Sequence, residues 1–185
     1  VILKSLEKTE KLIKTNNINL SLYPGSEVLL SDEIPGLLKK GNIVTLNNSR
    51  YIMIEFRMGS IPLYAEEILF EIKLNGYIPI IAHPERNLEI LKNPDIIERL
   101  IGTGCLLQIN SGSLTGDFKR SNKKMALYLL KKSKVTFIGT DAHSYRMRKP
   151  TMYKAFFMIH KKFGLEMAKN LFYRNPYKIL HNKEI

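Results

Sequence analysis

The feature that most constrains the fold is a regular alternation of apolar and amphipathic segments that begins at Tyr51. Each apolar run is short and rich in Ile, Val, Leu or Phe, as expected for strands buried on both faces. Amphipathic, helix-like segments separate these runs. Strand–helix alternation indicates a parallel sheet with helical crossovers, so we expect an α/β fold. The predicted strands cover residues 51–56, 77–83, 105–110 and 135–143.

A polar residue stands at or near the carboxyl end of each predicted strand. These residues are Glu55, His83, Asn110 and Asp141, and the successive gaps between them are 28, 27 and 31 residues. Each gap has the length of one βα unit. Parallel strands bring their carboxyl ends to one edge of the sheet, where α/β barrels and open α/β sheets both place their sites. We therefore expect the four side chains to gather at a single site.

Composition sets the class of protein and its surroundings. The chain has 185 residues, 44% of them hydrophobic, which suits one folded domain over residues 1–185. We predict no membrane span, because no apolar run has the required length. One cysteine excludes an internal disulfide and fits a reducing, cytoplasmic compartment. The net charge is 29 − 17 = +12, which favours an anionic partner but is equally explained by lysines that solvate helix faces.

The amino end of the chain is charged and amphipathic. Residues 2–15 predict a helix whose apolar side chains, Leu3, Leu6, Leu12 and Ile13, face inward. This pattern is unlike a signal peptide. Because the chain starts on Val1 in the middle of the pattern, we expect it to be a piece of a longer protein that has lost its amino end.

The stretch GTDAHS places two metal-binding residue types close together. Asp141 and His143 are two residues apart, so an extended segment would point both side chains to the same side. A carboxylate and an imidazole suit Mn, Fe or Zn. The alternative is an aspartate that caps a turn beside an unrelated loop histidine.

The stretch IPIIAHPERN ends an apolar strand on four polar or special residues. Pro84 predicts extended geometry for His83, which would hold the imidazole at the strand tip. Taken alone, such a histidine is more often a hydrogen-bonded structural residue. Glu85 either orients a histidine or faces solvent. Arg86 either binds an anion through two hydrogen bonds or braces the loop.

Two glutamates lie among apolar residues. Glu55 ends the strand IMIEF, and Glu27 follows a Pro-Gly turn. A carboxylate in such surroundings costs free energy unless it is paired or binds a cation. Together with His83, Asp141 and His143, these acids indicate a metal centre. Cys105 lacks the Cys-x5-Arg context of a phosphate loop, so we expect it to be buried in a strand.

Five segments in order, SEVLL, RYIMIEF, PIIAHPERN, LLQINSGS and FIGTDAHS, carry a family resemblance. The chain resembles the polymerase-and-histidinol-phosphatase (PHP) superfamily, and more closely the bacterial manganese-dependent tyrosine phosphatases of capsule and exopolysaccharide biosynthesis. The resemblance covers nearly the whole chain. It implies a distorted (β/α)7 TIM-like barrel of the PHP type, here lacking the first strand or strands, that holds up to three divalent metals.

The resemblance also implies roles for residues and partners. The expected substrate is phosphotyrosine on the tail of a partner tyrosine kinase, hydrolysed in the cytoplasm by a metal-activated hydroxide. We expect Mn as the metal, with Fe, Zn or Mg as alternatives. We expect no bound nucleic acid, and the sequence allows either a monomer or an oligomer. Arg86 and Arg148 would contact the substrate phosphate and serve catalysis. Glu55 would bridge two metals, and the full implied metal-ligand set is Glu27, Glu55, His83, Asp141 and His143.

The sequence departs from the family pattern in one respect. The family opens with an Asp-x-His-x-His strand, which this chain does not contain; its histidines are His83, His143, His160 and His181. We therefore expect this chain to be unable to complete the metal cluster by itself. Two other readings remain: a PHP-type phosphoesterase acting on a small molecule or nucleic acid, and a degenerate, non-catalytic binding subunit.

Overall fold

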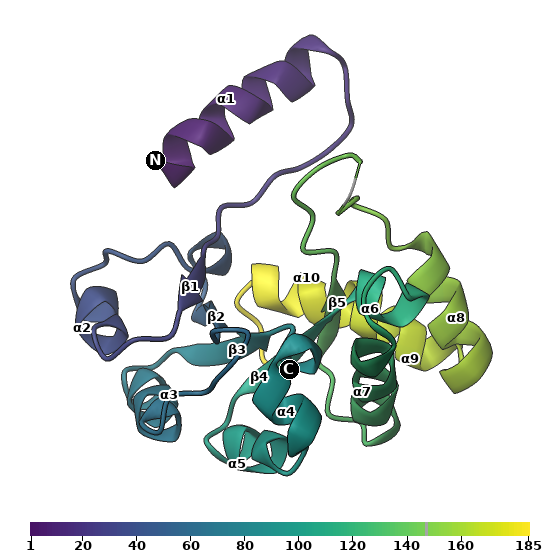
Figure 1. The fold of residues 1–185 in the computed structure, drawn as a ribbon. Helices are drawn as coiled ribbons and strands as arrows, with labels where there is room; N and C mark the ends of the chain where they lie inside the picture. Colours follow the sequence, from purple (N-terminus) through teal and green to yellow (C-terminus); the bar gives the residue numbers. More distant parts are fainter. Residues whose placement is uncertain (147) are drawn as a thin grey trace.

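A computed structural model describes residues 1–146 and 148–185. In these residues one parallel sheet runs through the molecule, with its strands in sequence order from β1 to β5 (Figure 1). The α/β class predicted from the sequence is confirmed. In the described residues β1 and β5 form the two edges of the sheet. The strands are β1 (Glu27–Leu29), β2 (Tyr51–Glu55), β3 (Ile78–Ala82), β4 (Leu106–Asn110) and β5 (Phe137–Gly139).

The register of the strands aligns their carboxyl ends. Leu29 pairs with Glu55, Ala82 with Gln108, and Asn110 with Gly139. Since all four pairings are parallel, the residues that follow each strand emerge at the same edge. This edge is where the polar strand-end residues were expected.

Helices connect and cover the strands (Figure 1). None of the helices in the described ranges is both long and apolar enough to cross a membrane. The helices are α1 (Ile2–Thr15), α2 (Ile34–Lys39), α3 (Ala65–Leu74), α4 (Leu88–Lys92), α5 (Ile96–Gly102), α6 (Ser111–Thr115), α7 (Arg120–Lys131), α8 (Tyr153–Phe163), α9 (Leu165–Lys169) and α10 (Asn175–Leu180), with the short 3-10 helices η1 (Leu46–Asn48) and η2 (Pro84–Arg86) and the π-helical segment η3 (Asn170–Arg174).

The core lies between the sheet and the helices packed on it. Ile54, Ile81 and Leu107 from neighbouring strands are fully buried in the same cluster as Leu69 of α3. Burying each such side chain contributes about 1.5–3 kcal/mol to folding. Gly76, with φ of +85°, follows the carboxyl end of α3 in the left-handed conformation that commonly ends helices. The apolar periodicity therefore located the core correctly.

Helix α1 forms as predicted, but its apolar face does not pack inward. None of its 14 residues is buried, and Leu3 and Leu12 are 58% and 56% exposed. Figure 1 shows α1 standing apart from the sheet at the end of an extended connection. The expectation that Leu3, Leu6, Leu12 and Ile13 face a core was wrong, because the connection carries the helix away from the sheet.

Candidate metal and anion site

His83 leaves the end of β3 in a conformation that differs from the prediction. Its φ and ψ are +33° and +50°, in the left-handed region, rather than extended. The chain turns sharply here into η2, where the Arg86 backbone N–H donates to the His83 carbonyl at 3.0 Å. A left-handed conformation for a residue other than glycine costs about 1–3 kcal/mol and is typical of functional sites. The reversal from strand to turn therefore overrides the extended preference before Pro84.

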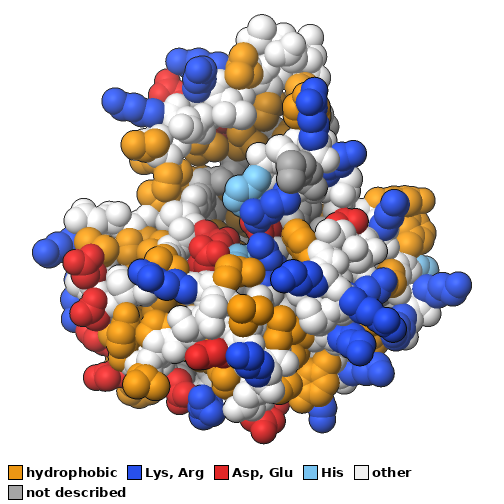
Figure 2. Space-filling model, viewed as in Figure 1, with side chains coloured by type: hydrophobic (Ala, Val, Ile, Leu, Met, Phe, Trp, Pro, Cys, Tyr) orange, Lys and Arg blue, Asp and Glu red, His pale blue; other side chains and the backbone are white. Residues whose placement is uncertain are grey.

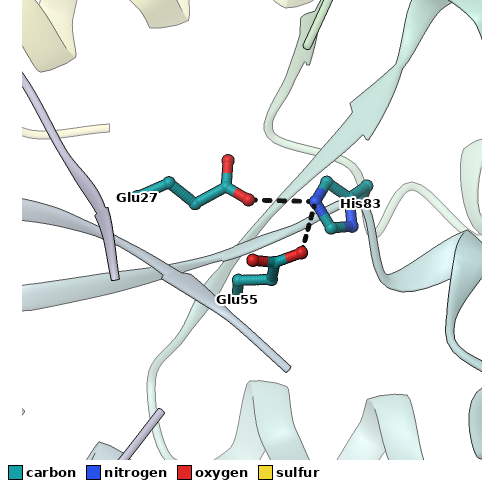
Figure 3. A group of neighbouring side chains, drawn as sticks. All are labelled: Glu27, Glu55 and His83. Carbon is teal, nitrogen blue, oxygen red and sulfur yellow. Dashed lines mark hydrogen bonds and ion pairs between the residues drawn. The ribbon is translucent and has the colours of Figure 1, made fainter. Parts of the chain in front are cut away.

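Three side chains from three neighbouring strands meet at the carboxyl edge of the sheet. The Nε2 atom of His83 lies 3.0 Å from Oε1 of Glu27 and 3.5 Å from Oε1 of Glu55. Figure 3 shows both carboxylates directed at the imidazole, one from β1 and one from β2. The His83 side chain is buried, whereas the two glutamates are about one-third exposed. We call Glu27, Glu55 and His83 the acid–histidine trio.

Burial and charge act in opposite directions on His83. Burial lowers the pKa of its imidazole, but the hydrogen bond and the negative charge of Glu27 raise it, as does the charge of Glu85. Arg86 lowers the pKa of the same group. The result is a pKa above the ordinary value of 6.5. The surroundings of His83 therefore favour a positive charge at this point.

The donor set of the trio fits a divalent cation. One oxygen or nitrogen from each residue lies within 4.8 Å of the others, a spacing at which all three could bind one ion. Two carboxylates and one imidazole suit Mn, Fe, Zn or Mg, which accept mixed oxygen and nitrogen ligands. A cation here would also satisfy the preference of this position for positive charge. Sequence reasoning identified all three of these residues.

Asp141 and His143 lie outside this group in the described part of the chain. Asp141 has a φ of +51°, in the left-handed region, so the expected extended conformation was wrong at this residue. The two side chains still approach each other, with His143 Nδ1 3.4 Å from Asp141 Oδ1. The Asp141 side chain is 8% exposed and that of His143 is 62% exposed. Asp141 turns inward because it has strong partners there.

Those partners are the two arginines that the family resemblance assigned to phosphate binding. Arg86 Nη1 donates to Asp141 Oδ2 at 2.6 Å, and Arg148 forms an ion pair with the same oxygen. Asn110 Nδ2 donates to it as well, at 2.9 Å. The Arg86 guanidinium also lies 4.8 Å from the centre of the Phe118 ring. In this structure Asp141 is therefore the anion that both arginines hold.

A buried polar network supports the site, and sequence reasoning missed much of it. Gln108 Nε2 donates to Asn110 Oδ1 at 3.0 Å, and Gln108 Oε1 accepts from the His83 backbone N–H at 3.4 Å. Glu85 Oε1 accepts from the Ser113 hydroxyl at 2.6 Å and from the Asn110 N–H at 3.0 Å. Burial raises the pKa of Glu85, although these hydrogen bonds lower it. The sequence signal that could have predicted this network is the polar Gln108 inside the otherwise apolar strand LLQIN.

Comparison with known proteins identifies the family. Residues 1–181 match the model of the family described as capsular polysaccharide synthesis, CpsB/CapC. The chain belongs to the CpsB/CapC family. It is 37% identical over 176 residues to the tyrosine-protein phosphatase YwqE of Bacillus subtilis, covering 95% of this chain and 66% of that protein. It is 35% identical over 172 residues to the tyrosine-protein phosphatase CpsB of Streptococcus pneumoniae, covering 90% of this chain and 71% of that protein.

A solved structure supports the same assignment. All of this chain matches 74% of a chain from crystal structures of YwqE and CpsB, described as unique metal-dependent tyrosine phosphatases, with a TM-score of 0.96 and 35% identity. Family membership predicted from the five sequence segments is thereby confirmed. The chain spans 66% of the length of YwqE.

Proposed function

We propose that this chain carries the catalytic site of a metal-dependent phosphotyrosine phosphatase. The observation that supports this most directly is the acid–histidine trio beside two arginines, in a chain whose relatives are tyrosine-protein phosphatases. A cation site next to an anion site is an arrangement suited to metal-assisted hydrolysis of a phosphate monoester.

The residues have separate roles in this proposal. Glu27, Glu55 and His83 hold a divalent cation, Mn²⁺ in the first instance. Such an ion lowers the pKa of bound water and offsets the charge of phosphoryl oxygens. Arg86 and Arg148 donate hydrogen bonds to the substrate phosphate, which takes the place that the Asp141 carboxylate occupies here. Asp141 and His143 are the remaining proposed metal ligands, available once the phosphate has replaced Asp141 between the arginines.

Further parts of the proposal rest on family membership. The five-stranded sheet is proposed to belong to a distorted (β/α)7 barrel, with residues 1–185 in a single domain. The proposed substrate is phosphotyrosine on the tail of a tyrosine kinase that controls capsule or exopolysaccharide synthesis, and the proposed location is the cytoplasm. The match to the capsular polysaccharide family supports these assignments.

One observation favours a second candidate function. In the described residues only three of the five predicted ligands meet, and Asp141 is held by two arginines. A chain with this arrangement could bind a phosphorylated partner through its arginines without hydrolysing it. The alternative is therefore a non-catalytic subunit that recognises phosphotyrosine.

One experiment separates the two functions. Binding of Mn²⁺ is measured by calorimetry, and phosphate release from a phosphotyrosine peptide is measured with and without Mn²⁺. Hydrolysis predicts Mn²⁺-dependent release that falls at least about 100-fold in Glu55→Gln and His83→Ala, because each substitution removes a metal ligand. The control is Glu98→Gln, which changes an exposed glutamate paired with Lys134.

The outcomes assign the function. Release that needs Mn²⁺ and the trio supports the phosphatase. Binding of the phosphopeptide without release of phosphate, under conditions in which Mn²⁺ binds, contradicts it and supports the binding subunit. Release that is unchanged in Glu55→Gln would contradict the assignment of the trio.

A further inference from the structure

A basic cavity lies beside the proposed phosphate site. Its volume is about 520 Å³, and Arg148, which contacts Asp141, forms part of its wall. Figure 2 shows Lys and Arg side chains gathered near the centre of this face, next to a group of acidic side chains. The cavity and the proposed phosphate site therefore share one arginine.

Three further basic side chains line the cavity. Arg146, Lys149 and Lys154 all border it, and in the described residues none of them forms an ion pair with an acidic side chain. Asp117 is the acidic residue in the cavity wall, and its Oδ2 accepts a hydrogen bond from Thr115 at 2.8 Å. Positive charge is therefore in excess here and unneutralised.

An aromatic side chain links this cavity to a second one. Phe118 lines both the basic cavity and a neighbouring cavity of about 550 Å³, which Arg86, Met58 and Leu88 also line. The second cavity thus offers apolar surface next to one phosphate-binding arginine, and the basic cavity offers charge next to the other. The ring of a phosphotyrosine suits the apolar second cavity. Acidic residues next to that phosphotyrosine in the peptide suit the basic cavity.

We propose that the basic cavity binds acidic side chains that flank the phosphotyrosine in a peptide substrate. This inference rests on the proposed function and adds the class of sequence that the site selects. An extended peptide advances about 3.3–3.6 Å per residue, so with its phosphate at Arg148 the next one to three residues reach the cavity wall. Arg146, Lys149 and Lys154 would then pair with Asp or Glu side chains.

The test measures binding of fluorescent phosphotyrosine peptides to the full chain by anisotropy. One peptide has Glu and Asp around the phosphotyrosine, and a second has Gln and Asn at the same positions. We expect the acidic peptide to bind about tenfold more tightly, because each partly exposed ion pair contributes only a few-fold. The ratio should decrease at high salt, which screens such pairs.

Two matched variants locate the effect. In Arg146→Ser/Lys149→Ser/Lys154→Ser the ratio of the two affinities should fall to nearly one. The control, Lys124→Ser/Lys131→Ser/Lys161→Ser, removes the same charge from exposed positions on α7 and α8 that do not line the cavity, and it should keep the ratio. Circular dichroism checks that both variants fold.

The outcomes separate this inference from the proposed function. A wild-type ratio near one, or an equal loss in both triple variants, would overturn the cavity assignment. Tighter binding of single-stranded DNA than of the acidic peptide, lost in the first variant, would overturn it in favour of nucleic acid. Phosphate release without a flank preference refutes only the inference. If the chain prefers the acidic peptide only when its tyrosine is phosphorylated, but releases no phosphate, only the proposed hydrolysis is refuted.

Discussion

At the scale of single residues, the arrangement of the site depends on which charged side chains pair with one another. His83 faces Glu27 and Glu55, whereas Asp141 faces Arg86 and Arg148. Each pairing sets the protonation or orientation of its members before any ligand binds. Two predictions concern these pairings.

The first prediction concerns the pH dependence of His83 in metal-free protein. Its pKa is raised above 6.5, so the folded state binds the proton more tightly than the unfolded state. The resulting stabilisation is complete below pH 6.5 and is lost as pH rises through the raised pKa. In Glu27→Gln the pKa of His83 should fall, which an NMR titration of the imidazole measures. An unchanged pKa in that variant would contradict the assigned cause.

The second prediction concerns Asp141. Asp141→Asn leaves two arginines close together without their shared carboxylate, at a position where Asp141 is 8% exposed. We expect the free energy of unfolding to fall by about 2 kcal/mol, since breaking a buried pair costs 3–5 kcal/mol and both arginines are partly exposed. Urea denaturation measures the change.

A matched control accompanies Asp141→Asn. Glu98→Gln breaks an ion pair with Lys134 in which the glutamate side chain is 58% exposed, and it should cost less than about 0.5 kcal/mol. Equal effects of the two substitutions would show that the arginines do not depend on Asp141.

At the scale of elements, the strands and their register place the site residues. Helix α1, in contrast, forms without packing on the sheet and contributes no buried residue. The contact between β4 and β5 is especially close. Gly139 ends β5 and pairs with Asn110, and a Cβ atom there would lie 2.6 Å from Nε2 of Gln108. Gln108 in turn accepts from the backbone of His83.

The third prediction uses two glycines with opposite surroundings. Gly139→Ala should lower the free energy of unfolding by about 1–3 kcal/mol, because its Cβ displaces a buried side chain. Gly36→Ala, in α2 with open space around the new Cβ, should raise it by about 0.5–1 kcal/mol through helix propensity. Thermal and urea denaturation measure both. Stabilisation by Gly139→Ala would show that β5 does not pack closely against Gln108.

At the scale of the whole molecule, a single thiol reports on the integrity of the core. Cys105 is buried, as predicted from the sequence, but it lies just before β4 rather than in the strand, and Thr103 Oγ1 lies 3.0 Å from its sulfur. Burial raises its pKa to about 11, although the Thr103 hydrogen bond and the charge of Lys73 lower it.

The fourth prediction follows from that burial. Native protein should react with iodoacetamide at pH 8 at least about 100-fold more slowly than urea-unfolded protein, because both access and thiolate are suppressed. Mass spectrometry of the time course measures the rates. Fast labelling of native protein would indicate that the region before β4 opens readily.

The sequence by itself determined the α/β class, the position of four strands at the core and the family. It also placed Glu55 and His83 at one site, because strand-end polar residues one βα unit apart meet at one edge of a parallel sheet, and it named Glu27 because a carboxylate among apolar residues needs a partner. The class and the strands depend on local periodicity, and the family on short segments that resemble its members; a single sequence contains both. Tertiary structure decided the left-handed turn at His83, the outward placement of α1 and the buried network around Gln108. It also decided that Asp141 pairs with Arg86 and Arg148, because that choice depends on which of several charged groups, distant in sequence, lies nearest in the folded chain.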